Sequence, residues 1–154
     1  MKKIKLGFAS DHRGYELKEK LIAYFKLQED ILDITDCGTN SLNSCDYPDY
    51  AYLLGRELET NGVDFGIAIC GSGIGIGIAL NKMKGVYCAK VNNALEAKYT
   101  RLDNNTNAVS FSGDTSFSEA IRIVDTFIHT DFSSEERHKK RIEKVKRIEE
   151  NIYD

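Results

Sequence analysis

The chain has 154 residues, of which 29% are charged and 42% hydrophobic, and its formal net charge is −3. This length suits one domain with a core of its own, so we expect residues 1–154 to form a single domain. With no basic block, no visible targeting segment and no apolar run long enough to cross a membrane, we expect a cytoplasmic protein that binds neither nucleic acid nor membranes.

Short apolar runs alternate with helical patterns along the chain. Apolar runs predict strands at residues 3–10, 30–35, 63–70, 86–91 and 107–113. Apolar residues at helical spacing, with glycine stops at positions 62 and 85, predict helices at residues 15–28, 49–62, 75–85, 93–102, 116–130 and 133–152. Five β–α repeats without a linker predict an α/β fold, a doubly wound (Rossmann-like) five-stranded parallel sheet with helices on both faces and a long C-terminal helix.

The last predicted helix carries Ile142, Val145 and Ile148 as a narrow apolar stripe in a strongly charged segment. Such a stripe is typical of a helix that packs on another element. Two interpretations stay open: the helix covers its own domain, or it packs on a second subunit. His129 and His138 have no partner pattern and are predicted to lie on the surface.

The most unusual segment begins at Cys70, where glycines follow at positions 71, 73, 75 and 77. It matches neither the G-x-x-x-x-G-K-[ST] nor the G-x-G-x-x-G phosphate loop. Free N–H groups at a helix N-terminus suit an anion or a developing oxyanion, and a cysteine there is expected to carry some thiolate. The alternative is that Cys70 is a small buried residue and that the glycines only allow a helix to pack closely on the sheet.

Three basic side chains also draw attention. His12 follows the first predicted strand, at the sheet edge where ligands of such folds bind, and either a ligand role or a structural role fits it. Arg137 and Arg141 lie four residues apart, so they share one helix face. That face is either solvated or a clamp for phosphate, which guanidinium groups bind well.

The four cysteines form no C-x-x-C pair, so we expect free thiols and no zinc or dithiol motif.

Several stretches together resemble one family. They are FASDHRGYELK, DCGTNSLNSCDYPDYA, DFGIAICGSGIGIGIALNK, NNTNAVSFSG and ERHKKRIEKVKRIE. In this order they are similar to ribose-5-phosphate isomerase B and its relatives, which include the subunits of galactose-6-phosphate isomerase. The resemblance covers nearly the whole chain. It implies a sugar phosphate isomerase that converts an aldose to a ketose through a cis-enediolate without metal or cofactor, with ribose 5-phosphate as the expected substrate.

The resemblance also implies roles for individual residues. Cys70 would be the base that moves the proton between C1 and C2, and Ser72 would act beside its thiol. The backbone N–H groups of Gly71, Gly73, Ile74 and Gly75 would donate to the enediolate oxygen. Asp11 and Asn104 would bind sugar hydroxyls, and Tyr47 would lie near the ring oxygen. His12, Arg137 and Arg141 would bind the phosphate. The C-terminal helix would reach the neighbouring subunit's site, which implies a homodimer or a tetramer built from such dimers.

Two positions depart from the family pattern. Asp103 stands where the family commonly has a histidine assigned to sugar ring opening, so Asp103 becomes the candidate acid–base group. Asp114 stands where an arginine commonly aids phosphate binding. These changes leave two alternatives open: an isomerase of another sugar phosphate, such as a hexose or tetrose phosphate, or a non-catalytic subunit that binds a sugar phosphate.

Overall fold

The chain folds around one parallel sheet in a computed structural model that describes residues 2–154. The strands of this sheet are β1 (Ile4–Ser10), β2 (Leu32–Asp36), β3 (Phe65–Cys70), β4 (Cys88–Lys90) and β5 (Ala108–Ser112). Their spatial order is β2-β1-β3-β5-β4, and all neighbouring pairs are parallel. The predicted five-stranded parallel sheet is therefore confirmed, with the short β4 at one edge.

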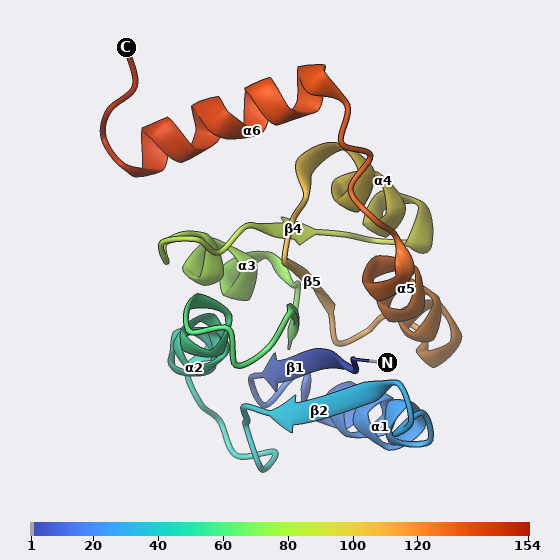
Figure 1. Cartoon of the computed structure of the whole chain (residues 1–154). Coiled ribbons are helices and arrows are strands. Elements are labelled where there is room, and N and C mark those ends of the chain that lie inside the picture. The colour runs from blue at the N-terminus through green and yellow to red at the C-terminus, as the bar shows by residue number, and fades with distance from the viewer. Residues whose placement is uncertain (1) are drawn as a thin grey trace.

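Helices cover both faces of the sheet (Figure 1). They are α1 (Tyr15–Lys26), α2 (Tyr47–Glu59), α3 (Ile74–Asn81), α4 (Ala94–Asn104), α5 (Phe117–His129) and α6 (Glu136–Glu149). Helices α1, α4 and α5 lie on one face and α2 and α3 on the other, while α6 lies outside these layers. The doubly wound arrangement and the long C-terminal helix are as predicted. Within the described residues, no helix combines the length and the apolar character needed to span a membrane.

Element boundaries differ from the prediction mainly where local backbone chemistry decides them. Helix α2 begins at Tyr47, two residues before the predicted start, because Pro48 fits its first turn. The first N–H groups of a helix have no intrahelical acceptor, so proline costs nothing there. Helix α3 ends at Asn81, and Gly85 in the following turn takes a left-handed conformation (φ 78°). Strand β4 has three residues, fewer than the six predicted at residues 86–91.

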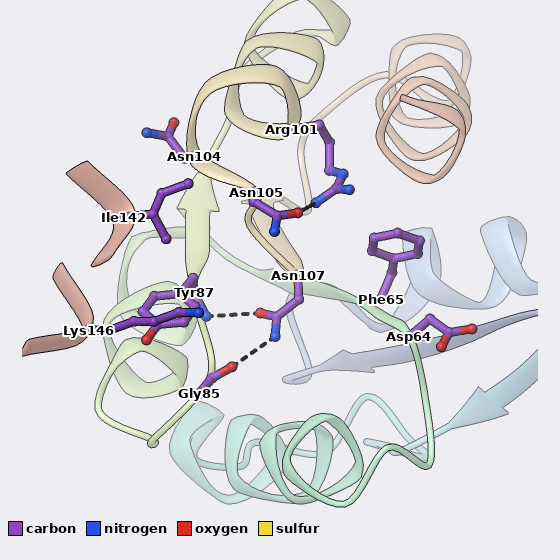
Figure 2. Close-up of a pocket in the computed structure, with 10 residues that line it drawn as sticks. All are labelled: Asp64, Phe65, Gly85, Tyr87, Arg101, Asn104, Asn105, Asn107, Ile142 and Lys146. Carbon is purple, nitrogen blue, oxygen red and sulfur yellow. Dashed lines mark hydrogen bonds between the residues drawn. The ribbon is translucent and has the colours of Figure 1, made fainter. Parts of the chain in front are cut away.

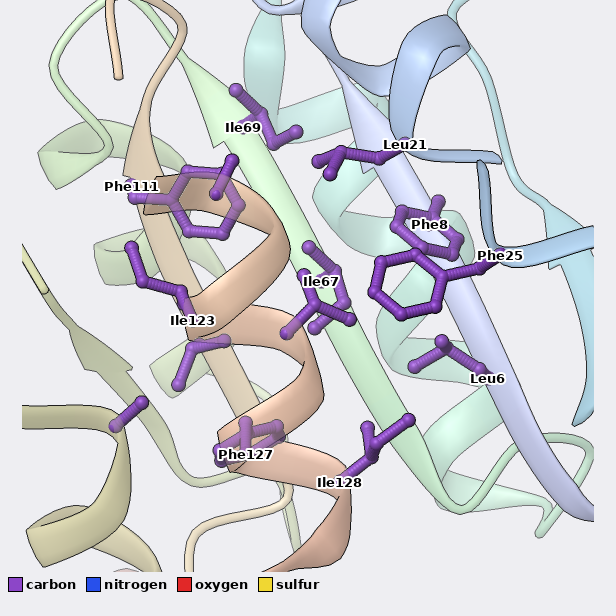
Figure 3. Close-up of a cluster of buried hydrophobic side chains, with 14 of the residues drawn as sticks. Leu6, Phe8, Leu21, Phe25, Ile67, Ile69, Phe111, Ile123, Phe127 and Ile128 are labelled. Atoms are coloured by element: carbon purple, nitrogen blue, oxygen red, sulfur yellow. The ribbon is translucent and has the colours of Figure 1, made fainter. Parts of the chain in front are cut away.

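Side chains that alternate along the strands form two cores, one on each face of the sheet. Helices α1 and α5 cover this face together, where Phe8, Ile67 and Phe111 of the strands are fully buried in one cluster with residues of both helices (Figure 3). On the other face, Ala68 and Cys70 of β3 pack with the residues of α2 and α3. The side chain of Cys70 therefore lies at the carboxyl end of β3, on the face that α3 covers.

Candidate functional site

The carboxyl end of β1 leads into a turn that Asp11 organises. Asp11 is 5% exposed, and its Oδ1 accepts hydrogen bonds from the backbone N–H groups of Arg13 (2.9 Å) and Gly14 (3.1 Å). Among the described residues, the second carboxylate oxygen makes no hydrogen bond. One oxygen therefore fixes the start of α1, and the other is left for a ligand.

His12 follows in the same turn and contacts the loop before α2. Its Nδ1 accepts the backbone N–H of Cys45 at 3.2 Å, and the Cys45 Sγ lies 3.8 Å from the same nitrogen. Because Nδ1 accepts, the neutral ring carries its proton on Nε2. The imidazole therefore presents an N–H donor away from the loop.

The glycine loop surrounds the thiol of Cys70, which is 4% exposed. The backbone N–H of Gly73 donates to the Cys70 Sγ at 3.2 Å, which fixes the position of the sulfur in the loop. The Ser72 Oγ accepts the N–H of Ile74 at 3.1 Å, so the serine hydroxyl can still donate its own proton. No hydrogen bond within the described chain uses the N–H of Gly71 or Ser72. These two amides are therefore available to an incoming oxygen.

Two of the four glycines are explained by close packing on β5. Gly73 has a left-handed backbone (φ 78°), and a Cβ there would lie 2.6 Å from the backbone of Phe111. A Cβ on Gly77 would lie 2.6 Å from the Ser110 Oγ. For these positions the packing interpretation holds.

The other two glycines lie under side chains at the open end of the loop. A Cβ on Gly75 would lie 2.6 Å from the ring of Tyr47, so the glycine lets the phenol reach the loop. A Cβ on Gly71 would lie 3.1 Å from the guanidinium of Arg13. Tyr47 was predicted to line the site, whereas Arg13 was missed by the sequence reasoning. Its position directly after Asp11 and His12, between a strand end and a helix, is the signal that could have found it.

Asp103 and Asn104 lie at the end of the sheet opposite to Cys70, where the amino ends of β3 and β5 lie. They end α4, which runs from the carboxyl end of β4 back toward the amino end of β5. Asn104 lines an open pocket of about 360 Å³ together with Phe65, the first residue of β3, and Ile142 of α6 (Figure 2). Within one chain, these two residues therefore do not meet Cys70.

Helix α6 lies along the same edge as Asp103. The Glu149 carboxylate accepts hydrogen bonds from the Gly85 N–H (2.9 Å) and the Tyr87 hydroxyl (2.8 Å), which holds the end of the helix. His138 is 8% exposed, and its Nε2 lies 3.4 Å from the Asp103 Oδ1. The predicted surface position of His138 is therefore wrong, because the ring packs between α6 and α4. His129 is partly exposed, as predicted.

The predicted site residues thus form two groups. Arg137 pairs with Glu135 at 2.9 Å, and both Arg137 and Arg141 are exposed on α6. We call the first group the cysteine-loop cluster: Asp11, His12, Tyr47, Cys70, Gly71, Ser72, Gly73, Ile74 and Gly75. We call the second group the C-terminal cluster: Asp103, Asn104, Arg137 and Arg141. Within one chain, the cysteine-loop cluster lies at the carboxyl end of the sheet, whereas the C-terminal cluster lies on α4 and α6, away from Cys70.

All four cysteines are free thiols, and two of them are expected to react slowly because they stay protonated. Burial raises the pKa of Cys37 to about 11, with the charges of Glu57 and Asp36 adding to the shift. Burial also raises the pKa of Cys88 to about 12. Both thiols are therefore held protonated at neutral pH.

Comparison with known proteins gives one consistent family. The family described as Ribose/Galactose Isomerase matches residues 6–145. Ribose-5-phosphate isomerase B of Escherichia coli is 34% identical over 147 residues, which cover 95% of this chain and 97% of that protein. The solved Clostridium thermocellum ribose-5-phosphate isomerase B superposes with a TM-score of 0.92 at 34% identity, covering 96% of this chain and 99% of the other. The Mycoplasma genitalium ribose-5-phosphate isomerase B, solved with bound ribulose-5-phosphate, gives a TM-score of 0.90 at 35% identity, with 97% and 99% covered.

Proposed function

Because the chain belongs to the ribose/galactose isomerase family, we propose that it interconverts ribose 5-phosphate and ribulose 5-phosphate by proton transfer alone, as a step of the pentose phosphate pathway. The observation that carries this proposal is the cysteine loop. Cys70 is the last residue of β3, in front of the loop that leads into α3, with the Gly73 N–H directed at its sulfur and two unused amide donors beside it. Proton abstraction beside a carbonyl needs this combination of a base and a preformed oxyanion site.

The reaction follows from this geometry. The Cys70 thiolate takes the proton from C2 of the open-chain aldose. The electron pair of that C–H bond forms the C1=C2 bond, and the carbonyl pair moves onto O1. The amides of Gly71 and Ser72 donate to this oxygen. The thiol then returns the proton to C1 while the O2 proton passes to O1 with the help of the Ser72 hydroxyl, which leaves the ketone at C2.

The remaining members of the cysteine-loop cluster bind the substrate. The free carboxylate oxygen of Asp11 accepts from a sugar hydroxyl, and the Tyr47 phenol borders the sugar ring. The Nε2–H of His12 donates to the phosphate. Gly73, Ile74 and Gly75 contribute backbone around the reacting carbons. These roles are supported by the position of each group at the open end of the loop.

A second copy of the chain would complete the site. We propose a homodimer, which can pair further into a tetramer, in which the C-terminal cluster of one subunit faces the cysteine-loop cluster of the other. Arg137 and Arg141 would then bind the phosphate and Asn104 a sugar hydroxyl. The exposed apolar side chains of α6, Val145 (48% exposed) and Ile148 (60%), support such an interface. The free thiols fit a cytoplasmic location.

Asp103 is the reason to test further substrates. It would take the place of the family's ring-opening histidine, and its contact with His138 supplies an imidazole beside the carboxylate. If this pair suits a different sugar ring, a hexose or tetrose phosphate will be the better substrate. A panel of sugar phosphates at equal concentrations distinguishes these substrates from ribose 5-phosphate.

The direct test measures formation of ribulose 5-phosphate from ribose 5-phosphate by the wild type, Cys70→Ala and the matched control Cys88→Ala. We expect turnover by the wild type and the control and none by Cys70→Ala. Equal rates for the wild type and Cys70→Ala would refute the role of the thiol. If the wild type binds a sugar phosphate but neither forms the isomeric sugar nor exchanges the C1 or C2 hydrogen with solvent deuterium, the chain is a binding subunit instead.

A further inference from the structure

Arg13 is a cationic side chain that neither the sequence pattern nor the proposed roles account for. Its guanidinium lies against Gly71, where a Cβ would meet the guanidinium carbon and Nε at 3.1 Å. Asp11 holds the backbone of Arg13 through its N–H, but makes no bond to the guanidinium. Across residues 2–154, the guanidinium of Arg13 forms no ion pair and no hydrogen bond. The side chain is exposed, so a ligand can reach it. The positive charge beside the loop is therefore uncompensated by a carboxylate contact.

We propose that Arg13 is a substrate-contacting residue that stabilises the negative charge of the enediolate. This proposal rests on the proposed function. The unused N–H of Gly71 and the guanidinium of Arg13 belong to the same small region of the loop, so an oxygen bound by the amide meets the cation as well. Fixed positive groups at the place where charge develops are worth more in the transition state than in the ground state.

The reacting end of the sugar, rather than its phosphate, is the expected partner of this guanidinium. In ribose 5-phosphate the phosphate is on C5, at the opposite end of the carbon chain from C1 and C2. Because Cys70 must reach C2, we expect a cation packed on the neighbouring residue Gly71 to lie nearer to C1 and C2 than to the phosphate on C5. Loss of Arg13 should therefore lower kcat, whereas loss of a phosphate contact would mainly raise KM.

The test compares steady-state kinetics with ribose 5-phosphate for the wild type, Arg13→Ala, Arg13→Lys and the control Arg56→Ala. Arg56 is an exposed arginine on α2 that pairs with Glu59, about 13 Å along the helix from Tyr47. We expect kcat to fall about 10- to 100-fold in Arg13→Ala with KM within about threefold, since one oxyanion donor typically contributes this much or more. Arg13→Lys should be intermediate, Arg56→Ala should match the wild type, and added ethylguanidinium should partly restore Arg13→Ala.

The other outcomes contradict either the role of Arg13 or the proposed function itself. A kcat for Arg13→Ala equal to the wild type overturns the role of Arg13, whether or not KM changes. If Arg13→Ala does not fold by circular dichroism, Arg13→Lys and Arg13→Gln decide instead, and wild-type kcat in Arg13→Gln overturns it. A wild type that turns over no sugar phosphate refutes the proposed function itself, whereas an active wild type with an equally active Arg13→Ala refutes only this inference.

Discussion

Gly73 and Gly85 form a matched pair that separates two reasons for needing glycine. Both have φ 78°, but a Cβ on Gly73 would lie 2.6 Å from the backbone of Phe111, whereas a Cβ on Gly85 would meet nothing within 4 Å. A left-handed conformation costs a residue with a Cβ about 1–2 kcal/mol. Overpacking against a fixed neighbour adds about 1–3 kcal/mol. We expect Gly85→Ala to lose only the first amount and Gly73→Ala both, about 2–5 kcal/mol.

Urea denaturation of both variants measures these free energies of unfolding. For a chain of this length, each kcal/mol corresponds to a shift of about 2–4 °C in Tm, so thermal unfolding gives a second readout. Gly73→Ala should also lose isomerase activity, because relief of the clash moves the N–H that donates to Cys70. Equal destabilisation of the two variants would refute the argument. It would mean that β5 yields to the extra carbon and that close packing does not require glycine at this position.

Two further predictions concern the thiols with raised pKa and the ion pairs of Lys18. In the folded chain at pH 8, iodoacetamide should alkylate Cys37 roughly 100-fold more slowly than in the unfolded chain, because its pKa rises from 9.0 to about 11. Alkylation of Cys88, whose pKa rises to about 12, should be slower still. Mass spectrometry of the peptides measures the alkylation rate of each thiol. Both raised pKa values stabilise the fold below pH 9, and this stabilisation is lost as the pH rises through 11 to 12. If either thiol in the folded chain is alkylated as fast as in the unfolded chain, its raised pKa is contradicted. The fully buried Lys18 Nζ lies 2.9 Å from Asp36 and 2.8 Å from Glu19, so Asp36→Ala removes one of its two carboxylate partners. This variant should cost about 2 kcal/mol in urea, whereas the control Asp33→Ala on the same strand should cost under about 0.5 kcal/mol.

The sheet could be predicted because parallel strands covered on both faces are apolar runs separated by helical periodicity. The strand order could not, since nothing in the β4 or β5 segments states that β5 lies beside β3 and that β4 forms the edge. The cysteine-loop cluster was predictable from the rule that ligands bind at carboxyl ends of strands. His138 was mispredicted because its partner Asp103 lies 35 residues earlier, and only the packing of α6 on α4 brings them together.

The separation of the two clusters follows from the length of α4. This helix has 11 residues, so it runs about 16 Å from the carboxyl edge of the sheet to the amino edge. Asp103 and Asn104 at its end are thus carried away from Cys70, and α6, which packs beside them, carries Arg137 and Arg141 with it. Small adjustments of side chains cannot close such a distance, so either the C-terminal cluster acts in another subunit or it does not act on this substrate. Mixing a Cys70→Ala subunit with an Arg137→Ala, Arg141→Ala subunit decides between these cases, because a shared site would restore activity in the mixed dimer.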